Sequence, residues 1–345
     1  MTGPDTRLIA VTMGDPAGIG LDIILTAWPL RHLRGLPRFV VYGNATVVRD
    51  RGQRLGVDTN VCVVGSVQES AACGRDALPL ISVGSCGHVT PGQPVAASAP
   101  ATISAIDQAT AAVLTGAARA LVTAPISKAV LYGAGFRHPG HTEYLAHLAS
   151  IHQGGTAIQP VMMLACEELK VVPATIHIPL AAVPGALTRD VIEATITITA
   201  DALRRDFGLA QPRIAVCGLN PHAGESGTLG REEIEIIAPV IALLAERGLQ
   251  VSGPFSADTL FHAEARTRYD AVVAMYHDQA LIPIKTLAFD RGVNVTLGLP
   301  FVRTSPDHGT AFDIAGTGRA NPESFIAALK LADRMATQRN RTRPD

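Results

Sequence analysis

Short apolar runs alternate along this chain with longer segments in which apolar residues recur every three or four positions. Runs such as Leu8–Thr12 and Ala271–Met275 carry no charged residue, which is typical of strands buried on both faces. The segments Ile103–Gly116 and Val191–Gly208 have helical periodicity. Further strands are expected at Phe39–Tyr42, Leu121–Thr123 and Ile214–Cys217. This alternation predicts an α/β fold with a largely parallel sheet.

Composition supports that fold class and excludes some partners. Of 345 residues, 47% are hydrophobic but only 4% aromatic, so aliphatic side chains must fill the core. A chain of this length suits two sub-domains that share a cleft. The 29 basic and 30 acidic residues form no long run of one sign, so neither nucleic acid nor an acidic membrane is an expected partner.

The cysteines and the N-terminus bear on location. The five cysteines are odd in number and form no C-x-x-C pair; they are Cys62, Cys73, Cys86, Cys166 and Cys217. They are expected to be reduced, mostly packed thiols. Met1–Arg7 is polar, unlike a signal peptide, and no apolar run is long enough to span a bilayer. We therefore expect a cytoplasmic protein without a membrane span.

Two segments look irregular. Gly, Pro, Ser and Ala dominate His88–Pro100, which predicts a long connecting loop. The tail after Ala332 is polar and is expected to fray.

Three histidines share a position type, because His222 and His277 follow expected strands and His177 lies within the apolar run Thr175–Ile178. They are His177, His222 and His277. In open α/β sheets, ligands bind beyond the carboxyl ends of strands, where three imidazoles could hold a metal with positions open for substrate. Their spacing matches no local metal motif. An ordinary hydrogen-bonded histidine therefore remains the alternative for each.

Three loops could contact an anion. Met13-Gly-Asp-Pro-Ala-Gly-Ile-Gly20 links a strand to a helix, but it matches neither usual nucleotide motif, and a plain turn is the better interpretation. Lys128 and the pair His141–Thr142 lie in loops rich in hydroxyl groups. The alternatives are a surface lysine for Lys128 and helix capping for His141 and Thr142.

The segment from Asp278 to Ala311 is dense in polar residues. Lys285, Asn294 and Arg303 could clamp a carboxylate and a phosphate. Asp307 and His308 could orient a cofactor ribose, although a turn built on Pro306 and Gly309 explains them equally well.

These phrases together resemble the 4-hydroxythreonine-4-phosphate dehydrogenase family. The matching pieces run in order along the chain: Gly14-Asp-Pro-Ala-Gly-Ile-Gly20, Thr123-Ala-Pro-Ile-Ser-Lys128, Gly140-His-Thr-Glu143, Gly218-Leu-Asn-Pro-His-Ala-Gly-Glu225, Ala257-Asp-Thr-Leu-Phe261, Ala274-Met-Tyr-His-Asp-Gln279 and Thr304-Ser-Pro-Asp-His-Gly-Thr-Ala311. One departure follows Gly20, where many relatives read Pro-Glu and this chain reads Leu21-Asp22. It leaves the shape of that loop open.

The resemblance implies an isocitrate-dehydrogenase-like α/β enzyme with its active site in the cleft between two sub-domains. It implies a homodimer in which the partner completes the site. The sub-domains are expected to comprise residues 1–130 plus 280–345, carrying both termini, and residues 131–279, carrying the metal and dimerisation functions.

The implied reaction is the oxidation of 4-phosphooxy-L-threonine by NAD or NADP. Its product, 2-amino-3-oxo-4-phosphooxybutanoate, loses CO2 to give 3-amino-2-oxopropyl phosphate, a precursor of pyridoxal 5′-phosphate. A divalent metal (Zn, Mg or Co) would lower the pKa of the substrate hydroxyl. The metal ligands match His177, His222 and His277, and the substrate contacts match His141, Thr142, Lys285, Asn294 and Arg303.

Two roles stay open at this point. The proton acceptor is Lys285, Asp258 or a water-linked group. Without a Rossmann fingerprint, the cofactor is expected on two other loops, Asp290–Gly298 and Asp307–Gly316, with Asp290, Asp307 and His308 as contacts.

Rival functions are a dehydrogenase of the same fold for a phosphorylated sugar acid or an aromatic cis-dihydrodiol carboxylate, an acyltransferase, and a non-catalytic metal or metabolite binder. The three histidines and the implied NAD count against the acyltransferase.

Overall fold

The computed structural model describes residues 7–342, which form two compact units. Unit 1 comprises Met1–Pro160 and Leu299–Thr337, and unit 2 comprises Val161–Gly298 and Gln338–Asp345. The sub-domains expected from the sequence were 1–130 with 280–345 and 131–279, and the metal-binding and dimerisation role expected of 131–279 stays a prediction. Most of the polar segment Met1–Arg7 lies outside the described residues. Among residues 7–342, no helix combines the length and the hydropathy that a membrane span requires.

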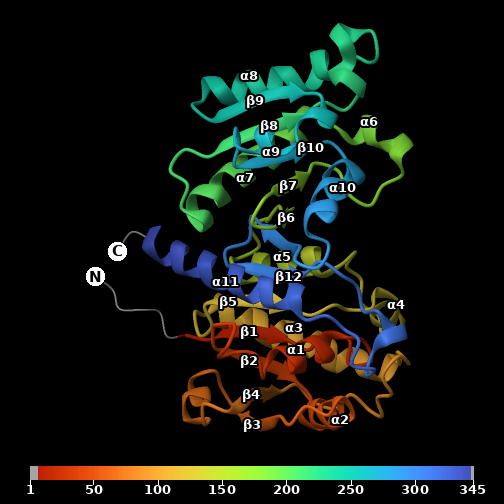
Figure 1. Cartoon of the computed structure of the whole chain (residues 1–345), viewed down its shortest axis with the longest axis vertical. Helices are drawn as coiled ribbons and strands as arrows, with labels where there is room; N and C mark the ends of the chain where they lie inside the picture. Colours follow the sequence, from red (N-terminus) through yellow and green to blue (C-terminus); the bar gives the residue numbers. More distant parts are fainter. Residues whose placement is uncertain (1–6, 343–345) are drawn as a thin grey trace. The chain divides into compact units, whose positions relative to one another are not determined.

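Unit 1 is built on a parallel sheet (Figure 1). Its strands are β1 (Ile9–Thr12), β2 (Phe39–Gly43), β3 (Asn60–Val64), β4 (Ala77–Ser82), β5 (Ala120–Thr123) and β12 (Arg303–Pro306). Their order is β3-β4-β2-β1-β5-β12. The central strand β1 is buried along its whole length, as its apolar run predicts, and pairs Ile9 with Phe39 on one side and Ala120 on the other.

Unit 2 has a mixed sheet in the order β11-β6-β7-β10-β8-β9. Its strands are β6 (Val161–Ala165), β7 (Lys170–Pro173), β8 (Arg213–Cys217), β9 (Gln250–Phe255), β10 (Ala271–Ala274) and β11 (Val293–Leu297). β6 runs antiparallel to β7 and β11, whereas β7, β10, β8 and β9 are parallel. Side chains such as Val171, Val272 and Ile284 form its core. Together the two units confirm the expected α/β class with mostly parallel strands.

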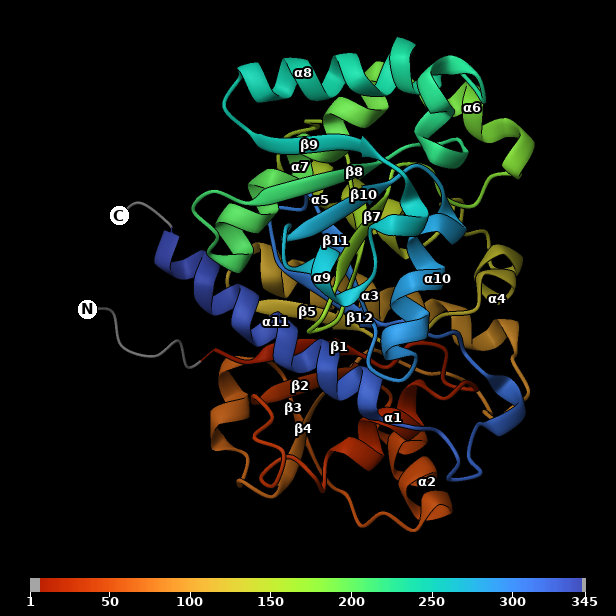
Figure 2. The same ribbon diagram turned by 45° about the horizontal axis from the view of Figure 1, so that its top comes forward.

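Helices cover these sheets. In unit 1 they are α1 (Gly20–Ala27), α2 (Ala45–Leu55), α3 (Ala99–Leu114), α4 (Lys128–Gly133) and α5 (His141–His152), with short helices η1 (Gln68–Ala72), η2 (Ala96–Ser98) and η7 (Phe312–Ile314). In unit 2 they are α6 (Val183–Ala186), α7 (Arg189–Phe207), α8 (Ala238–Glu246), α9 (Ala263–Arg266) and α10 (His277–Ala288), with η3 (Leu180–Ala182), η4 (Pro221–Gly227), η5 (Glu233–Ile237) and η6 (Ala257–Thr259). Helix α8 lies along β9 in both views (Figures 1 and 2).

Local signals set the ends of α7. The Thr188 side chain accepts a hydrogen bond from the Val191 amide at 3.2 Å and caps the N-terminus. Gly208, with φ of 74°, ends the helix in the left-handed conformation, as the sequence predicts.

Two expectations about irregular segments need correction. The loop expected at His88–Pro100 ends earlier, because η2 and then α3 begin at Ala96 and Ala99. The tail after Ala332 does not fray within the described residues. Helix α11 (Glu323–Thr342) continues through it, and Met335 and Ala336 are buried.

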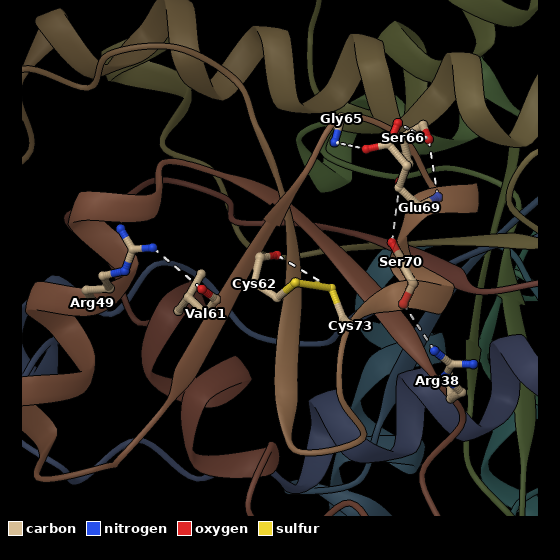
Figure 3. Close-up of a disulfide and its surroundings, with 9 residues drawn as sticks. All are labelled: Arg38, Arg49, Val61, Cys62, Gly65, Ser66, Glu69, Ser70 and Cys73. Carbon is tan, nitrogen blue, oxygen red and sulfur yellow. Dashed lines mark hydrogen bonds between the residues drawn. A yellow bond between two sulfur atoms is a disulfide. The ribbon is translucent and has the colours of Figure 1, made fainter.

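The expectation that all cysteines are reduced is wrong for two of them. Cys62 on β3 and Cys73 after η1 form a disulfide with a Cα–Cα distance of 6.1 Å (Figure 3). The turn between β3 and β4 brings them together, which a count of cysteines does not reveal. Cys86, Cys166 and Cys217 are free thiols.

Candidate active site

The candidate metal histidines follow three neighbouring parallel strands of unit 2. β10 lies between β7 and β8, and all three run in the same direction. His177 follows the end of β7, His222 follows β8, and His277 begins α10 directly after β10. The structure thus places each histidine beyond the carboxyl end of a strand, as the sequence predicts.

His177 and His277 come together. Their ring centroids are 5.6 Å apart, and both line a cavity of 350 Å³ with Thr175, Ile178 and Asp278 among its walls. The buried Thr175 hydroxyl donates to the Met275 carbonyl at 2.8 Å and ties the two histidine-bearing segments to each other. His277 Nδ1 lies 2.7 Å from an Asp278 carboxylate oxygen, a contact that orients the imidazole.

His222 does not join this pair. Within residues 7–342, no group of three or more His, Cys, Asp or Glu side chains is arranged to hold a metal. Nδ1 of the exposed His222 ring lies 3.9 Å from a carboxylate oxygen of Glu225. The described residues of one chain therefore supply a pair of imidazoles and a separate third one.

The backbone at two of these histidines is unusual. His177 has φ of 49° and His222 has φ of 52°, both in the left-handed region. For residues other than glycine this conformation costs about 1–2 kcal/mol each. Such strain persists only where surrounding contacts hold it, and it concentrates at functional sites. Sequence reasoning missed this feature, for which the glycines around His222 were the available signal.

Unit 1 contains a buried cationic side chain, that of Arg303. The Arg303 guanidinium on β12 donates to the Thr123 hydroxyl at 3.2 and 2.6 Å. Burial lowers the pKa of Arg303 to about 10, and the carboxylate of Glu143 acts in the opposite direction. The side chain therefore stays charged near neutral pH and offers a desolvated site for an anion.

His141 lies at the start of α5. Its Nε2 atom is buried without a hydrogen-bond partner among the described residues. Burial, and secondarily the charge of Arg303, lowers the pKa of His141 well below 6.5, so the imidazole is neutral and can donate to a bound oxygen. Gly140 is the N-cap residue and no side chain caps the helix, so Thr142 is not a cap.

Lys285 and Asn294 belong to unit 2. Lys285 is half-buried on α10, with its ammonium group 5.6 Å from the centre of the Phe289 ring. Asn294 lies on β11, and its Oδ1 atom is buried without a hydrogen-bond partner within residues 7–342. An unsatisfied buried acceptor is costly, which favours a ligand donor at this position.

The other candidate catalytic residue is more exposed. Asp258 lies on η6, and one of its carboxylate oxygens accepts a hydrogen bond from the Ser256 hydroxyl at 2.5 Å. This contact holds the carboxylate in place.

The segments expected to bind the cofactor differ in structure. Asp290–Gly298 is not a loop, because most of it forms β11; Asp290 itself is exposed after α10. Asp307–Gly316 is largely irregular. In it the Asp307 amide donates to the Ser324 hydroxyl at 3.0 Å, and His308 Nδ1 lies 3.1 Å from the Gly309 carbonyl.

A buried ion pair fastens that second segment to the glycine-rich turn. Asp22 pairs with Arg51, and its other oxygen accepts from the Gly316 amide at 2.6 Å. The Ile19 amide donates to the Thr310 carbonyl at 2.9 Å. Asp22, the position where the chain departs from many relatives, thus has a structural role that sequence reasoning did not identify.

A mixed α/β chain with imidazoles at the ends of parallel strands and a desolvated arginine defines the class: an α/β enzyme for a small anionic substrate. Comparison with known proteins identifies the family. The family model described as "Pyridoxal phosphate biosynthetic protein PdxA" matches residues 36–332. This chain belongs to the PdxA family.

Similar proteins cover nearly its whole length. A 4-hydroxythreonine-4-phosphate dehydrogenase of Bradyrhizobium diazoefficiens is 54% identical over 97% of this chain and 99% of its own. A crystal structure of the enzyme of that name from Klebsiella pneumoniae matches with a TM-score of 0.86 and 42% identity, covering 96% of this chain and 99% of that one. A terephthalate 1,2-cis-dihydrodiol dehydrogenase of Burkholderia xenovorans matches less well, with a TM-score of 0.64, 31% identity and coverage of 95% and 98%.

Proposed function

We propose that this chain oxidises 4-phosphooxy-L-threonine with NAD or NADP, and that the resulting 2-amino-3-oxo-4-phosphooxybutanoate decarboxylates to 3-amino-2-oxopropyl phosphate. The product serves pyridoxal 5′-phosphate biosynthesis. The observation that carries this proposal is the 54% identity, over almost the full length, to a protein of that activity. A cytoplasmic location belongs to the same proposal, since it rests on the metabolic class of the family.

The proposed substrate contacts are described for each unit by itself. In unit 1, the charged Arg303 and the neutral His141 suit the phosphate. Thr142, which follows His141 in the first turn of α5, adds a hydroxyl to the proposed contacts. In unit 2, Lys285 adds a cation and Asn294 an unsatisfied amide. Such groups recognise an anionic substrate through charge-assisted hydrogen bonds.

The donor set fits a divalent metal. Neutral imidazoles are ligands for zinc and cobalt, and His177 and His277 already lie close together. Together with His222 they would hold the ion, which when bound polarises the substrate hydroxyl. Lys285 or Asp258 is proposed to accept the hydroxyl proton.

A second copy of the chain is proposed to complete the site. Several apolar side chains in the segments of the candidate ligands are exposed. Leu180 near His177 is 67% exposed, Ile282 on α10 is 64% exposed, and Phe289 directly after α10 is 73% exposed. Such residues at a functional edge favour a protein partner. The His177–His277 pair of one copy and the His222 side chain of the other copy would then form the set of three ligands.

The cofactor is proposed to bind against Asp307 and His308 in the segment Asp307–Gly316, and near Asp290. That segment is anchored to the glycine-rich turn through Asp22. A preformed loop of this kind costs less to order on binding.

The deciding experiment measures reduced cofactor with purified protein, a divalent metal and each candidate substrate. We expect turnover with 4-phosphooxy-L-threonine and release of CO2. The structural match to a terephthalate dihydrodiol dehydrogenase makes an aromatic cis-dihydrodiol carboxylate the alternative substrate. Turnover of the dihydrodiol carboxylate but not of 4-phosphooxy-L-threonine would refute the proposal and identify the dihydrodiol as the substrate.

A further inference from the structure

The turn that carries His222 has a backbone that its own sequence disfavours. Every residue from His222 to Gly227 has a positive φ, between 42° and 93°. Consecutive left-handed residues are rare in L-peptides, since each side chain crowds the following carbonyl group. A turn of this kind holds its shape only if neighbouring groups fix it.

The side chain of Glu233 contacts this turn on both sides of His222. Its side chain is buried, with 3% exposure, and accepts hydrogen bonds from the Asn220 amide at 2.7 Å and the Asn220 side chain at 3.0 Å. The carboxylate also packs on two glycines. A Cβ atom at Gly224 would lie 2.6 Å from one oxygen, and one at Gly218 would lie 3.0 Å from the other. Only glycine fits against Glu233 on both sides of His222.

Gln279 connects the same turn to the segment of His277. Its amide oxygen accepts from the Met275 backbone at 2.7 Å, and its amide nitrogen donates to the Gly218 carbonyl at 2.9 Å. One side chain therefore joins the end of β8 to the end of β10. Both of its hydrogen-bonding groups are used, so its orientation is fixed.

We propose that Glu233 and Gln279 are positioning residues that hold His222 and His277 ready to bind the metal. Neither side chain bonds to either imidazole; both act through the backbone that carries them. The inference rests on the proposed function in one respect, that His222 and His277 are metal ligands.

The test uses the full-length protein and Co²⁺ as the probe. Glu233→Gln keeps the size of the side chain but places an NH₂ group where one carboxylate oxygen now accepts a hydrogen bond. We expect Co²⁺ affinity to fall roughly tenfold or more, as is typical for groups that orient metal ligands. Amide hydrogen exchange across 222–227 should also become faster in the metal-free protein. Glu246→Gln, an exposed carboxylate on α8, is the matched control and should change neither quantity.

Gln279→Met provides a second, independent variant. It keeps the length of the side chain and removes both hydrogen bonds, with Gln153→Met at an exposed position as its control. If Glu233→Gln fails to fold, the same two measurements are made on Gln279→Met and on Glu233→Asp, which has a shorter carboxylate side chain. Unchanged Co²⁺ affinity and unchanged exchange in the folded variants would overturn the inference.

His222→Ala separates this inference from the proposed function. If His222→Ala binds Co²⁺ as tightly as the parent protein, the proposed metal site is wrong. If His222→Ala loses affinity but the folded Glu233 and Gln279 variants do not, the site stands and only their positioning role is lost.

Discussion

At the scale of single residues, burial decides the chemistry that a side chain can offer. Arg303 and His141 both belong to the proposed anion site of unit 1, yet burial leaves one charged and the other neutral. The charged guanidinium of Arg303 and the neutral imidazole of His141 can both donate hydrogen bonds to the oxygens of a phosphate ester. Both roles depend on the surroundings that unit 1 provides.

Arg303→Lys tests the role of the paired N–H donors of the Arg303 guanidinium. Lysine keeps the positive charge but loses the planar pair of donors, so we expect the KM for the phosphorylated substrate to rise roughly tenfold, with a smaller effect on kcat. Steady-state kinetics on the variant measure this change, with Arg204→Lys at a half-buried surface position of α7 as control. An unchanged KM would contradict a phosphate-binding role.

His141→Gln tests the neutral imidazole. The folded-state pKa of His141 lies well below 6.5, so below that pH the unfolded chain takes up a proton that the folded chain refuses. The parent protein should therefore lose stability as the pH falls below 6.5, and part of this loss should be absent in the variant. Urea unfolding at several pH values measures it, with the exposed His152→Gln as control. Parallel pH profiles of parent and variant would refute the prediction.

At the scale of elements, the end of α7 and the tail of α11 meet in a buried ion pair. The Asp206 carboxylate, whose side chain is 1% exposed, accepts from Arg339 at 2.6 and 2.7 Å and from Arg205 at 2.9 and 3.0 Å. Burial alone would raise the pKa of Asp206, but the hydrogen bonds from Arg339 and Arg205 outweigh it and lower the pKa. This pair explains why the polar tail is helical.

Asp206→Asn should destabilise the fold by about 3 kcal/mol, because it leaves the largely buried Arg339 guanidinium without its counter-charge. Chemical denaturation measures the loss. The exposed Asp201→Asn, which pairs with Arg204, should cost well under 1 kcal/mol. In the parent protein this stabilisation is present above the ordinary aspartate pKa and is lost as the pH falls through the lowered one. Equal effects of the two substitutions would show that the buried pair contributes little.

The Cys62–Cys73 disulfide is a second link between elements, because it joins β3 to the segment after η1. We expect only Cys86, Cys166 and Cys217 to react with a thiol reagent in the denatured, unreduced protein. Closing a short loop stabilises by about 2–3 kcal/mol, so Cys73→Ser should lower the free energy of unfolding by that amount under oxidising conditions. Mass spectrometry after alkylation counts the thiols. Five alkylated cysteines without reductant would contradict the bond.

At the scale of the whole molecule, the proposed dimer is the main expectation. Light scattering should give a mass near twice 36.1 kDa. Because Leu180 and Ile282 are exposed apolar residues, Leu180→Asp and Ile282→Asp should weaken the dimer and lower Co²⁺ affinity together. A monomeric parent protein with full activity would contradict a shared site.

Much of the fold follows from local patterns in the sequence. The apolar runs at β1, β8 and β10 predict strands, because a run without charged residues must be buried in a parallel sheet. Thr188 and Gly208 mark the ends of α7 for the same local reason: each satisfies backbone groups within one turn. The order of the histidines after strand ends was predictable in this way too.

Other features depend on contacts between residues far apart in the chain. The pairing of His177 with His277, the separate place of His222, the Cys62–Cys73 bond and the burial of Asp22 all arise when strands and turns assemble. Local periodicity carries no information on such pairs, since it reports only which face of an element is apolar. The sequence by itself determined the α/β class and the candidate ligands. Only the tertiary structure decided which ligands meet within one chain, because that depends on strand order and on a strained turn held by Glu233.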